Sequence, residues 1–294
     1  MKLLITGGSG FIGRNLCEYL SPSYEVSAPT SCELNLLDAT AVRQYLCLNH
    51  FDAVVHVATT RSNRRVGAPT DLLERNCRMF FNLARNDGLF GKMIHFGSGA
   101  EYERAGLPAR VREDYFDTRV PNDPYGFSKY ICAKYIERAE RIINLRLFGV
   151  FGKYEDYTVR FISNACCRVL KGLPIIIRQD VVFDYLYVED LAKITAWFIE
   201  HEPRYKTYNL CTGEGGSLTK FASAVEKVSN RNPPIIVRHD GLAPEYTADN
   251  SLLLNEIGAY KFCDPQRAIG ELYKWYASEE QGIDVESLRF DETR

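Results

Sequence analysis

A tyrosine, a lysine and a serine in the first half of the chain have the types and spacing needed for acid–base chemistry on a carbonyl group. Tyr125 and Lys129 stand four residues apart, after a polar pair and a proline at positions 122–124 that predict the start of a helix. Four residues are about one turn, so both side chains share a face, and an ammonium stabilises a nearby phenolate. Such a tyrosine can exchange a proton near neutral pH. Ser98, at the end of an apolar strand, can hydrogen-bond a carbonyl oxygen, although this tyrosine–lysine spacing also occurs by chance.

A glycine-rich loop near the start of the chain can hold a pyrophosphate. The run Thr6–Gly13 reads TGGSGFIG, follows a strand expected at Lys2–Thr6 and opens a helix expected at Phe11–Leu20. Glycines let backbone amides approach a phosphate, and a helix N-terminus adds free N–H groups. A tight turn without a ligand would look similar, but this strand–loop–helix context is typical of dinucleotide binding. The cofactor contacts expected here are Gly7, Gly10, Phe11, Ile12, Gly13 and Arg14.

The segment after the second expected strand, Tyr24–Ala28, indicates which dinucleotide is bound. An acid at the end of that strand would bind the ribose hydroxyls of NAD and disfavour the extra phosphate of NADP. No acid stands there, and Glu33 lies several residues later. Arg14 could supply positive charge, although it is equally well explained as a solvated helix residue. Hydroxyl donors for a phosphate follow the strand: Ser27, Thr30 and Ser31. These features favour NADP, with NAD as the alternative.

Alternating strand and helix patterns predict the fold class. Further apolar strands are expected at Ala53–Val57, Lys92–Gly97 and Ile142–Phe148, and helices at Ala39–Leu48, Asp71–Asn86, Tyr125–Arg141, Thr158–Lys171, Val188–Glu200, Leu218–Ser229 and Pro265–Tyr276. Apolar strands joined by helices indicate an α/β, Rossmann-type doubly wound parallel sheet. We expect this dinucleotide-binding domain over residues 1–155 and a smaller C-terminal α/β substrate lobe over 156–294, with about 181–210 returning to the main sheet. The acidic tail 278–294 predicts loose order.

Composition excludes several classes of protein. The 294 residues are 46% hydrophobic and 25% charged, as in soluble globular proteins. A net charge of −2 provides no field for nucleic acid or an anionic membrane. The N-terminal apolar run is too short for a signal peptide and no long apolar stretch exists, so we expect a cytoplasmic protein. The nine cysteines and five histidines show no metal-ligand spacing, which predicts reduced thiols and no metal.

Jointly, the motifs resemble those of extended short-chain dehydrogenases/reductases of the nucleotide-sugar epimerase/dehydratase/reductase family. The resemblance covers roughly residues 1–276 and is similar in motifs to 4-ketoreductases such as GDP-fucose synthases and to 4-epimerases. It rests on Thr6–Gly13, Glu33–Asp38, His56–Ala58, Phe96–Tyr102, Pro124–Lys129, Arg146–Gly152, Asp184–Asp190, Tyr208–Gly213 and Asp249–Ser251. These motifs are specific for the superfamily and not for a substrate.

The resemblance implies roles for individual residues. Asp38 would contact the adenine, with Leu37 beside it, and Ala58 would contact the dinucleotide backbone. Lys129 would hold the nicotinamide ribose, Tyr125 would donate the proton, and Ser98 would polarise the carbonyl. Similar proteins are homodimers built on the helix after the third strand and the tyrosine-bearing helix. Apolar residues available for that contact, unless they face the sheet, are Met79, Phe80, Phe81, Ile131, Tyr135 and Ile136.

Departures from the family pattern narrow the reaction. Gly99 and Ala100 stand where 4,6-dehydratases carry an Asp-Glu pair, and Ala100 replaces the cysteine of GDP-fucose synthases. Hydride transfer at a sugar carbonyl remains, so we expect reduction of the 4-keto group of a nucleotide-activated deoxysugar. The alternatives are a 4-epimerase with tightly bound NAD and a non-catalytic dinucleotide-binding protein on the same fold. The family pattern assigns no function to Glu101.

The expected substrate site lacks an arginine that usually binds the diphosphate in this family. Phe183 precedes Asp184, where the family usually has an arginine for the diphosphate. Arg178 is our expected substitute in the substrate site, together with Ser98 and Tyr125. A cluster formed by Arg61, Arg64 and Arg65 is the other source of positive charge.

Overall fold

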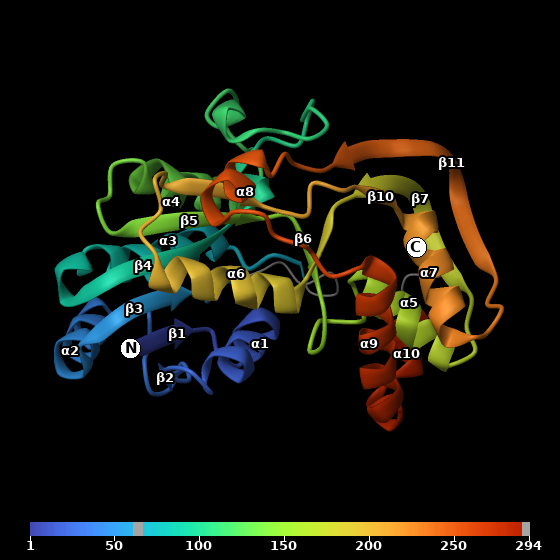
Figure 1. Cartoon of the computed structure of the whole chain (residues 1–294), viewed down its shortest axis with the longest axis horizontal. Helices are drawn as coiled ribbons and strands as arrows, with labels where there is room; N and C mark the ends of the chain where they lie inside the picture. Colours follow the sequence, from blue (N-terminus) through green and yellow to red (C-terminus); the bar gives the residue numbers. More distant parts are fainter. Residues whose placement is uncertain (61–66, 290–294) are drawn as a thin grey trace.

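A six-stranded parallel sheet forms the centre of the larger lobe (Figure 1). In this computed structural model, which describes residues 1–60 and 67–289, the strand order is β2-β1-β3-β4-β5-β9. Each neighbouring pair is parallel. The strands are β1 (Lys2–Thr6), β2 (Glu25–Ser27), β3 (Phe51–His56), β4 (Phe90–Ser98), β5 (Ile142–Leu147) and β9 (Thr207–Leu210). The order reverses beside β1, which places the ligand crevice of such folds beyond the carboxyl ends of β1 and β3.

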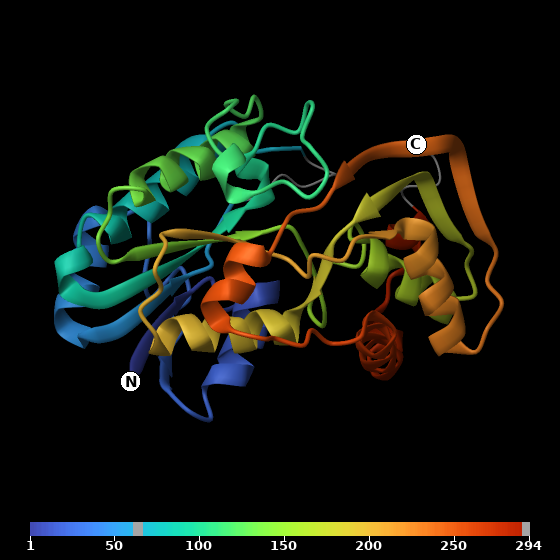
Figure 2. The ribbon, with the colours of Figure 1, turned by 45° about the horizontal axis from the view of Figure 1, so that its top comes forward.

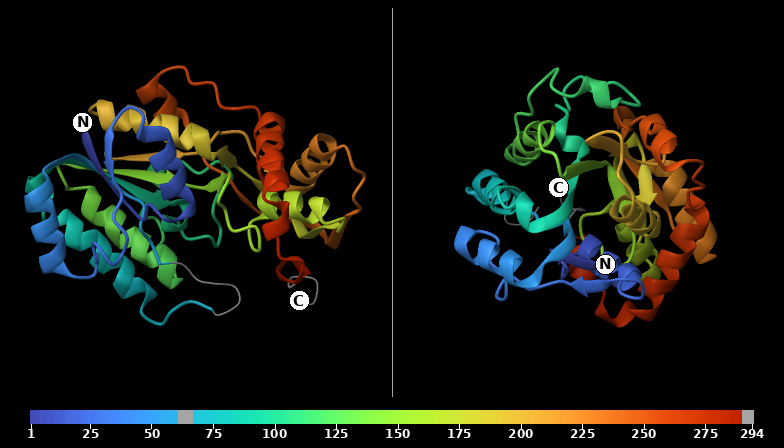
Figure 3. Two further views of the ribbon diagram at one scale, coloured as in Figure 1. Left: turned by 90° about the horizontal axis from the view of Figure 1, so that it is seen from below. Right: turned by 60° about the vertical axis from the view of Figure 1, so that its left-hand side comes forward.

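Helices cover both faces of this sheet, and each face has its own apolar core. They are α1 (Phe11–Leu20), α2 (Ala39–Asn49), α3 (Leu72–Ala84), α4 (Pro124–Ile136) and α6 (Val188–Glu200). Leu3 and Ile5 of β1 belong to one cluster, with residues of α1 and α6, whereas Leu4 belongs to the other, with residues of α2, α3 and α4. The left-hand view of Figure 3 shows these two layers of helices on opposite sides of the sheet. Alternation along the strands thus explains why they are apolar throughout.

The smaller lobe lies beyond one end of the main sheet (Figure 2). Its three-stranded sheet has the order β10-β7-β11, with β11 parallel and β10 antiparallel to β7. Two further strands, β6 and β8, pair in parallel, and Figure 1 shows β6 between the two lobes. The remaining elements are β6 (Gly149–Phe151), β7 (Ile175–Phe183), β8 (Tyr185–Tyr187), β10 (Gly216–Ser217), β11 (Ile235–Tyr246), α5 (Phe161–Leu170), α7 (Leu218–Ser229), α8 (Ser251–Ile257), α9 (Pro265–Ser278) and α10 (Val285–Arg289).

The fold class and most expected elements are confirmed, but the prediction of a loose tail is wrong for residues 278–289, whereas 290–294 lie outside the described residues. Beyond α9 the chain forms α10. Ile283 and Leu288 are buried in the core of the smaller lobe. Arg168 Nη1 of α5 also donates to the Leu288 carbonyl at 2.7 Å. Two well-placed apolar side chains are therefore enough to dock an otherwise polar segment.

Two further expectations concern surfaces. None of the helices in residues 1–60 and 67–289 is long and apolar enough to cross a membrane. Phe80 and Ile136, expected as dimer contacts, are instead fully buried in the core beneath α3 and α4. Tyr135 is exposed and stacks edge-on against Phe81.

Candidate active site

The glycine loop connects β1 to α1 so closely that side chains would not fit. Gly7 has φ +72°, a left-handed conformation that glycine adopts without strain. A Cβ on Gly7 would lie 2.9 Å from both the Cα and the N of Ala58, and one on Gly13 would lie 2.1 Å from the carbonyl oxygen of Gly7. The ends of β1 and β3 are joined as well, because Thr6 Oγ1 bonds His56 Nδ1 at 2.8 Å and accepts from the Ala58 amide at 3.3 Å.

The start of α1 fits a bound pyrophosphate. Gly10 is the N-cap residue, no side chain caps the helix, and the first turn contains no acid. The N-terminal amides and the positive end of the helix dipole are therefore left for an anion. Phe11 and Ile12 begin this helix, and Arg14 is exposed with its guanidinium 4.8 Å from the ring centre of Tyr154.

At the expected adenine end, sequence reasoning missed that Glu33 folds back to Thr30. Asp38 Oδ1 accepts from the amides of Thr40 and Ala41, so its carboxylate caps α2. Leu37 is half-buried just before it. Glu33 folds back to Thr30 and accepts from its amide at 2.7 Å and its hydroxyl at 2.9 Å. These two bonds lower the pKa of Glu33. They also hold its carboxylate at Thr30, near the end of β2.

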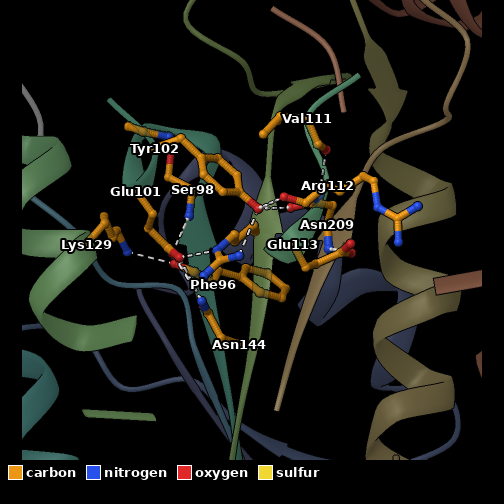
Figure 4. Close-up of polar contacts among 12 residues, drawn as sticks. Phe96, Ser98, Glu101, Tyr102, Val111, Arg112, Glu113, Lys129, Asn144 and Asn209 are labelled. Atoms are coloured by element: carbon orange, nitrogen blue, oxygen red, sulfur yellow. Dashed lines mark hydrogen bonds and ion pairs between the residues drawn. The ribbon is translucent and has the colours of Figure 1, made fainter. Parts of the chain in front are cut away.

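Ser98 is the last residue of β4 and begins a short 3₁₀ turn, Gly99–Glu101. Its Oγ accepts from the Ala100 amide at 3.1 Å, while its own amide donates to Glu101 Oε1 at 3.0 Å (Figure 4). Because the oxygen accepts from this amide, the hydroxyl proton can be donated to a further acceptor, such as the Tyr246 oxygen described below or a carbonyl oxygen.

Tyr125 and Lys129 lie on α4, which packs directly against the Ser98 turn. Asp123 caps the helix by accepting from the Gly126 amide at 2.8 Å. A Cβ on Gly126 would lie 2.6 Å from the carbonyl oxygen of Ala100, so glycine permits this close approach. The Tyr125 side chain is half-buried. Lys129 is 4% exposed, and its Nζ donates to the carbonyl of Phe96 in β4 at 2.7 Å.

The smaller lobe contributes a residue that sequence reasoning missed. Tyr246, at the end of β11, is buried, and its hydroxyl is hydrogen-bonded to the side chains of Ser98 and Arg104. Burial raises the pKa of this phenol, although both hydrogen bonds oppose the shift. The guanidinium of Arg104 lies 4.3 Å from the Tyr246 ring centre. A Cβ on Gly99 would lie 2.4 Å from the Tyr246 oxygen, so the glycine predicted to mark a lost acid also makes room for this phenol.

Two buried histidines lie behind Lys129. Burial, and then the charge of Lys129, lowers the pKa of His56 to about 3 and that of His95 well below its usual value. Both rings are therefore neutral at physiological pH. Neither nitrogen of His95 has a hydrogen-bond partner among the residues that the structure describes.

The expected arginines do not join the cluster around Ser98. Arg178 is exposed on β7, five residues before Phe183. Because a strand rises about 3.3 Å per residue, it lies roughly 16 Å along the strand from Phe183. Phe183 in turn packs against Tyr246 with ring centres 5.1 Å apart. The cluster Arg61, Arg64 and Arg65 lies outside the described residues. Within the described ranges, no group of three or more His, Cys, Asp or Glu residues is arranged for a metal ion.

Comparisons with known proteins agree with this geometry. The sequence model of the NAD dependent epimerase/dehydratase family matches residues 3–211. ADP-L-glycero-D-manno-heptose-6-epimerase of Pseudomonas paraeruginosa is 27% identical over 279 residues, 81% of this chain and 82% of that protein. GDP-6-deoxy-D-talose 4-dehydrogenase of Aggregatibacter actinomycetemcomitans is 27% identical over 297 residues, 93% and 97% of the two chains. The crystal structure of a GDP-L-fucose synthetase from Naegleria fowleri bound to NADP shares the fold, with a TM-score of 0.83, 15% identity and coverage of 95% and 93%.

A dinucleotide-type glycine loop, a switch point beside β1 and a Ser–Tyr–Lys set at one sheet edge define a nicotinamide-dependent α/β protein of the short-chain type. Within that class, the chain belongs to the NAD dependent epimerase/dehydratase family. Members of this family use nicotinamide dinucleotides, and both epimerases and 4-dehydrogenases are among the relatives of this chain.

Proposed function

We propose that this chain is an NAD(P)-dependent oxidoreductase that reduces the 4-keto group of a nucleotide-activated deoxysugar. The observation that carries the proposal is the contact between the Ser98 turn and α4, because it brings the Ser98 hydroxyl to the helix of Tyr125 and Lys129. The similarity to a GDP-6-deoxy-D-talose 4-dehydrogenase supports chemistry at C4.

Each of the three side chains has a distinct task in the proposed reaction. A bound reduced dinucleotide supplies the hydride. Ser98 donates a hydrogen bond to the carbonyl oxygen, and Tyr125 donates its proton to that oxygen as the alcohol forms. Lys129 stabilises the phenolate form of Tyr125 that remains after proton transfer, and it orients the cofactor ribose. We further propose that Arg178, which is exposed on β7, binds the phosphates of the nucleotide-linked substrate.

Replacement of Tyr125 by phenylalanine tests this proposal. With a GDP-linked 4-keto-6-deoxyhexose as the probe, Tyr125→Phe should lower kcat by about 100-fold or more, because a general acid contributes about 10²–10⁴-fold. Cofactor affinity should stay close to that of the wild type, as measured by thermal shift with NAD and NADPH. Undiminished turnover of the probe by Tyr125→Phe would refute the assignment.

A 4-epimerase that retains NAD is the second candidate, and Glu33 favours it. The carboxylate held by Thr30 near the end of β2 would repel the extra phosphate of NADP. The absence of an acid at the strand end itself favours NADP and the reductase. The absorbance spectrum of freshly purified protein, followed by extraction of the bound nucleotide, separates the two. Co-purified NAD and interconversion without added cofactor would indicate the epimerase.

We also propose that the protein is cytoplasmic and forms a homodimer. Among the residues expected at this contact, Tyr135 is exposed, and three others are half-buried: Met79, Phe81 and Ile131. Sedimentation of the wild type and of Tyr135→Glu tests it, and a monomeric wild type would contradict it.

A further inference from the structure

A buried ion pair lies directly beneath the Ser98 turn. The side chain of Glu101 is 0% exposed and that of Arg146, on β5, is 2% exposed. One carboxylate oxygen accepts from Arg146 Nε and, at 2.9 Å, from Asn144 Nδ2. The other oxygen accepts from the Ser98 amide at 3.0 Å (Figure 4). The carboxylate therefore bridges the end of β4 to the middle of β5.

Arg146 is itself held from several sides. Its Nη1 donates to the Tyr102 hydroxyl at 2.8 Å, and that hydroxyl donates to Asn209 Oδ1 on β9 at 2.8 Å. The guanidinium also lies over the rings of Tyr102 and Phe116, 4.8 and 4.3 Å from their centres. Burial alone would lower the pKa of Arg146, but the charges and hydrogen bonds of Glu101 and Tyr102 together raise it above its usual value, so the arginine stays protonated. The position of the Glu101 carboxylate is thus fixed from β5 and β9.

The backbone around this carboxylate leaves little room for another arrangement. A Cβ on Gly97 would lie 2.1 Å from Glu101 Oε1 and 2.2 Å from Asn144 Oδ1. Glu101 holds the Ser98 backbone through its amide, while the Ser98 side chain contacts the Ala100 amide and the Tyr246 hydroxyl. The backbone position from which the Ser98 hydroxyl projects therefore depends on where the carboxylate lies.

Stability does not explain why such a pair is present. Removing two charges from water carries a large desolvation cost, and buried pairs can often be replaced by apolar side chains without loss of stability. The pair touches the turn that presents the Ser98 hydroxyl to the reacting group. A role in fixing that turn accounts for its location.

We propose that Glu101, held by Arg146, is a positioning residue that fixes the Ser98 hydroxyl against the substrate carbonyl. The proposal rests on the proposed function above, because it assigns Ser98 to the carbonyl oxygen. It concerns no contact between Glu101 and the substrate: the carboxylate acts through the Ser98 amide.

The test removes both charges together, since either single replacement would leave an unpaired buried ion. The double variant Glu101→Leu with Arg146→Met should fold with a Tm within a few degrees of the wild type and bind NADPH as the wild type does. Its kcat for the GDP-linked 4-keto-6-deoxyhexose should fall about 10- to 100-fold. Tyr208→Phe, on β9, is the matched control, because it removes two hydrogen bonds of an interior tyrosine, from the Tyr205 amide and to Glu256, without touching Glu101, Arg146 or the Ser98 amide. Its kcat should stay within about threefold.

A cycle with Ser98→Ala separates positioning from a general structural effect. Ser98→Ala should lower kcat strongly in the wild type and only a few-fold in the double variant, since the hydroxyl there is already misplaced. Equal losses in both backgrounds would overturn the proposal. Amide hydrogen exchange of the segment 96–102 should also be faster in the double variant than in Tyr208→Phe.

The two proposals fail separately. If the wild type does not turn over the probe, the proposed reaction fails, and the exchange measurement alone decides whether Glu101 holds the turn. If Tyr125→Phe abolishes turnover while the double variant is fully active, only the positioning role is wrong. Unchanged exchange over 96–102 in the double variant overturns it in either case.

Discussion

Replacing Gly13 by alanine would place a methyl carbon 2.1 Å from the carbonyl oxygen of Gly7, 2.7 Å from its carbonyl carbon and 2.8 Å from the Cα of Gly8. All three atoms belong to the backbone, so no side chain can rotate away. The loop cannot retreat toward β3 either, because the Cβ position of Gly7 is already within 2.9 Å of Ala58. Relief requires α1 to move away from β1. We expect a loss of about 3 kcal/mol in the free energy of unfolding, the upper part of the usual range for overpacking.

Chemical denaturation of the cofactor-free protein measures this loss, and by thermal scan it corresponds to a Tm lowered by roughly 6–12 °C. Two alanine variants serve as controls. A Cβ on Gly10 would lie 3.4 Å from its nearest neighbour, an ordinary contact, and one on Gly88 would have no neighbour within 4 Å. Both should keep the free energy of unfolding within about 1 kcal/mol of the wild type. A Gly13→Ala protein as stable as these controls would refute the reasoning about the β1–α1 spacing.

Two further predictions concern the site's surroundings. His56 has a folded pKa of about 3 against an ordinary value of 6.5, so the unfolded chain binds more protons between these values. Stability is therefore complete above about pH 6.5 and falls as the pH drops, by about 2 kcal/mol at pH 5 for His56 alone. His95→Leu removes the second buried histidine with a lowered pKa, together with its two unpartnered nitrogens. This variant should have a higher Tm at pH 7 and a weaker dependence of Tm on pH between pH 6.5 and 5. An unchanged dependence of Tm on pH would contradict this. Gly126→Ala should push α4, with Tyr125 and Lys129, away from the Ala100 carbonyl and lower kcat at least tenfold. A kcat near the wild-type value would show that this close approach is dispensable.

Local rules were sufficient to predict most of the larger lobe from the sequence. β1 and α1 have the predicted bounds because an apolar run ends in glycines, and α4 begins where a polar residue and a proline predict it. These signals act within one turn or one strand. The helix carrying Tyr125 nevertheless ends at Ile136 rather than near Arg141. Residues 137–141, which read ERAER, contain no glycine or proline to mark this end in the sequence.

Contacts that join distant segments could not be predicted in this way. Tyr246 reaches Ser98 from the other lobe, and Ile283 and Leu288 dock a tail whose composition is polar. Glu101 and Arg146 did carry a signal, since each is a lone charge in an otherwise apolar strand or strand end. Opposite charges in such positions of neighbouring strands indicate a buried pair.

Several of the polar groups buried in the larger lobe lie at the carboxyl ends of its strands. Thr6 and His56 join β1 to β3, and Lys129 ties α4 to β4 through the Phe96 carbonyl. Glu101 with Arg146 joins β4 to β5. Each of these links orders a backbone segment that carries a proposed contact to cofactor or substrate. A site that must stabilise charge as a reaction proceeds benefits from groups already fixed in place, because they need not reorganise at that moment. The same argument explains why Tyr246, which enters from the smaller lobe, matters for the site. Its hydrogen bond to Ser98 makes the geometry of the larger lobe depend on how the two lobes pack.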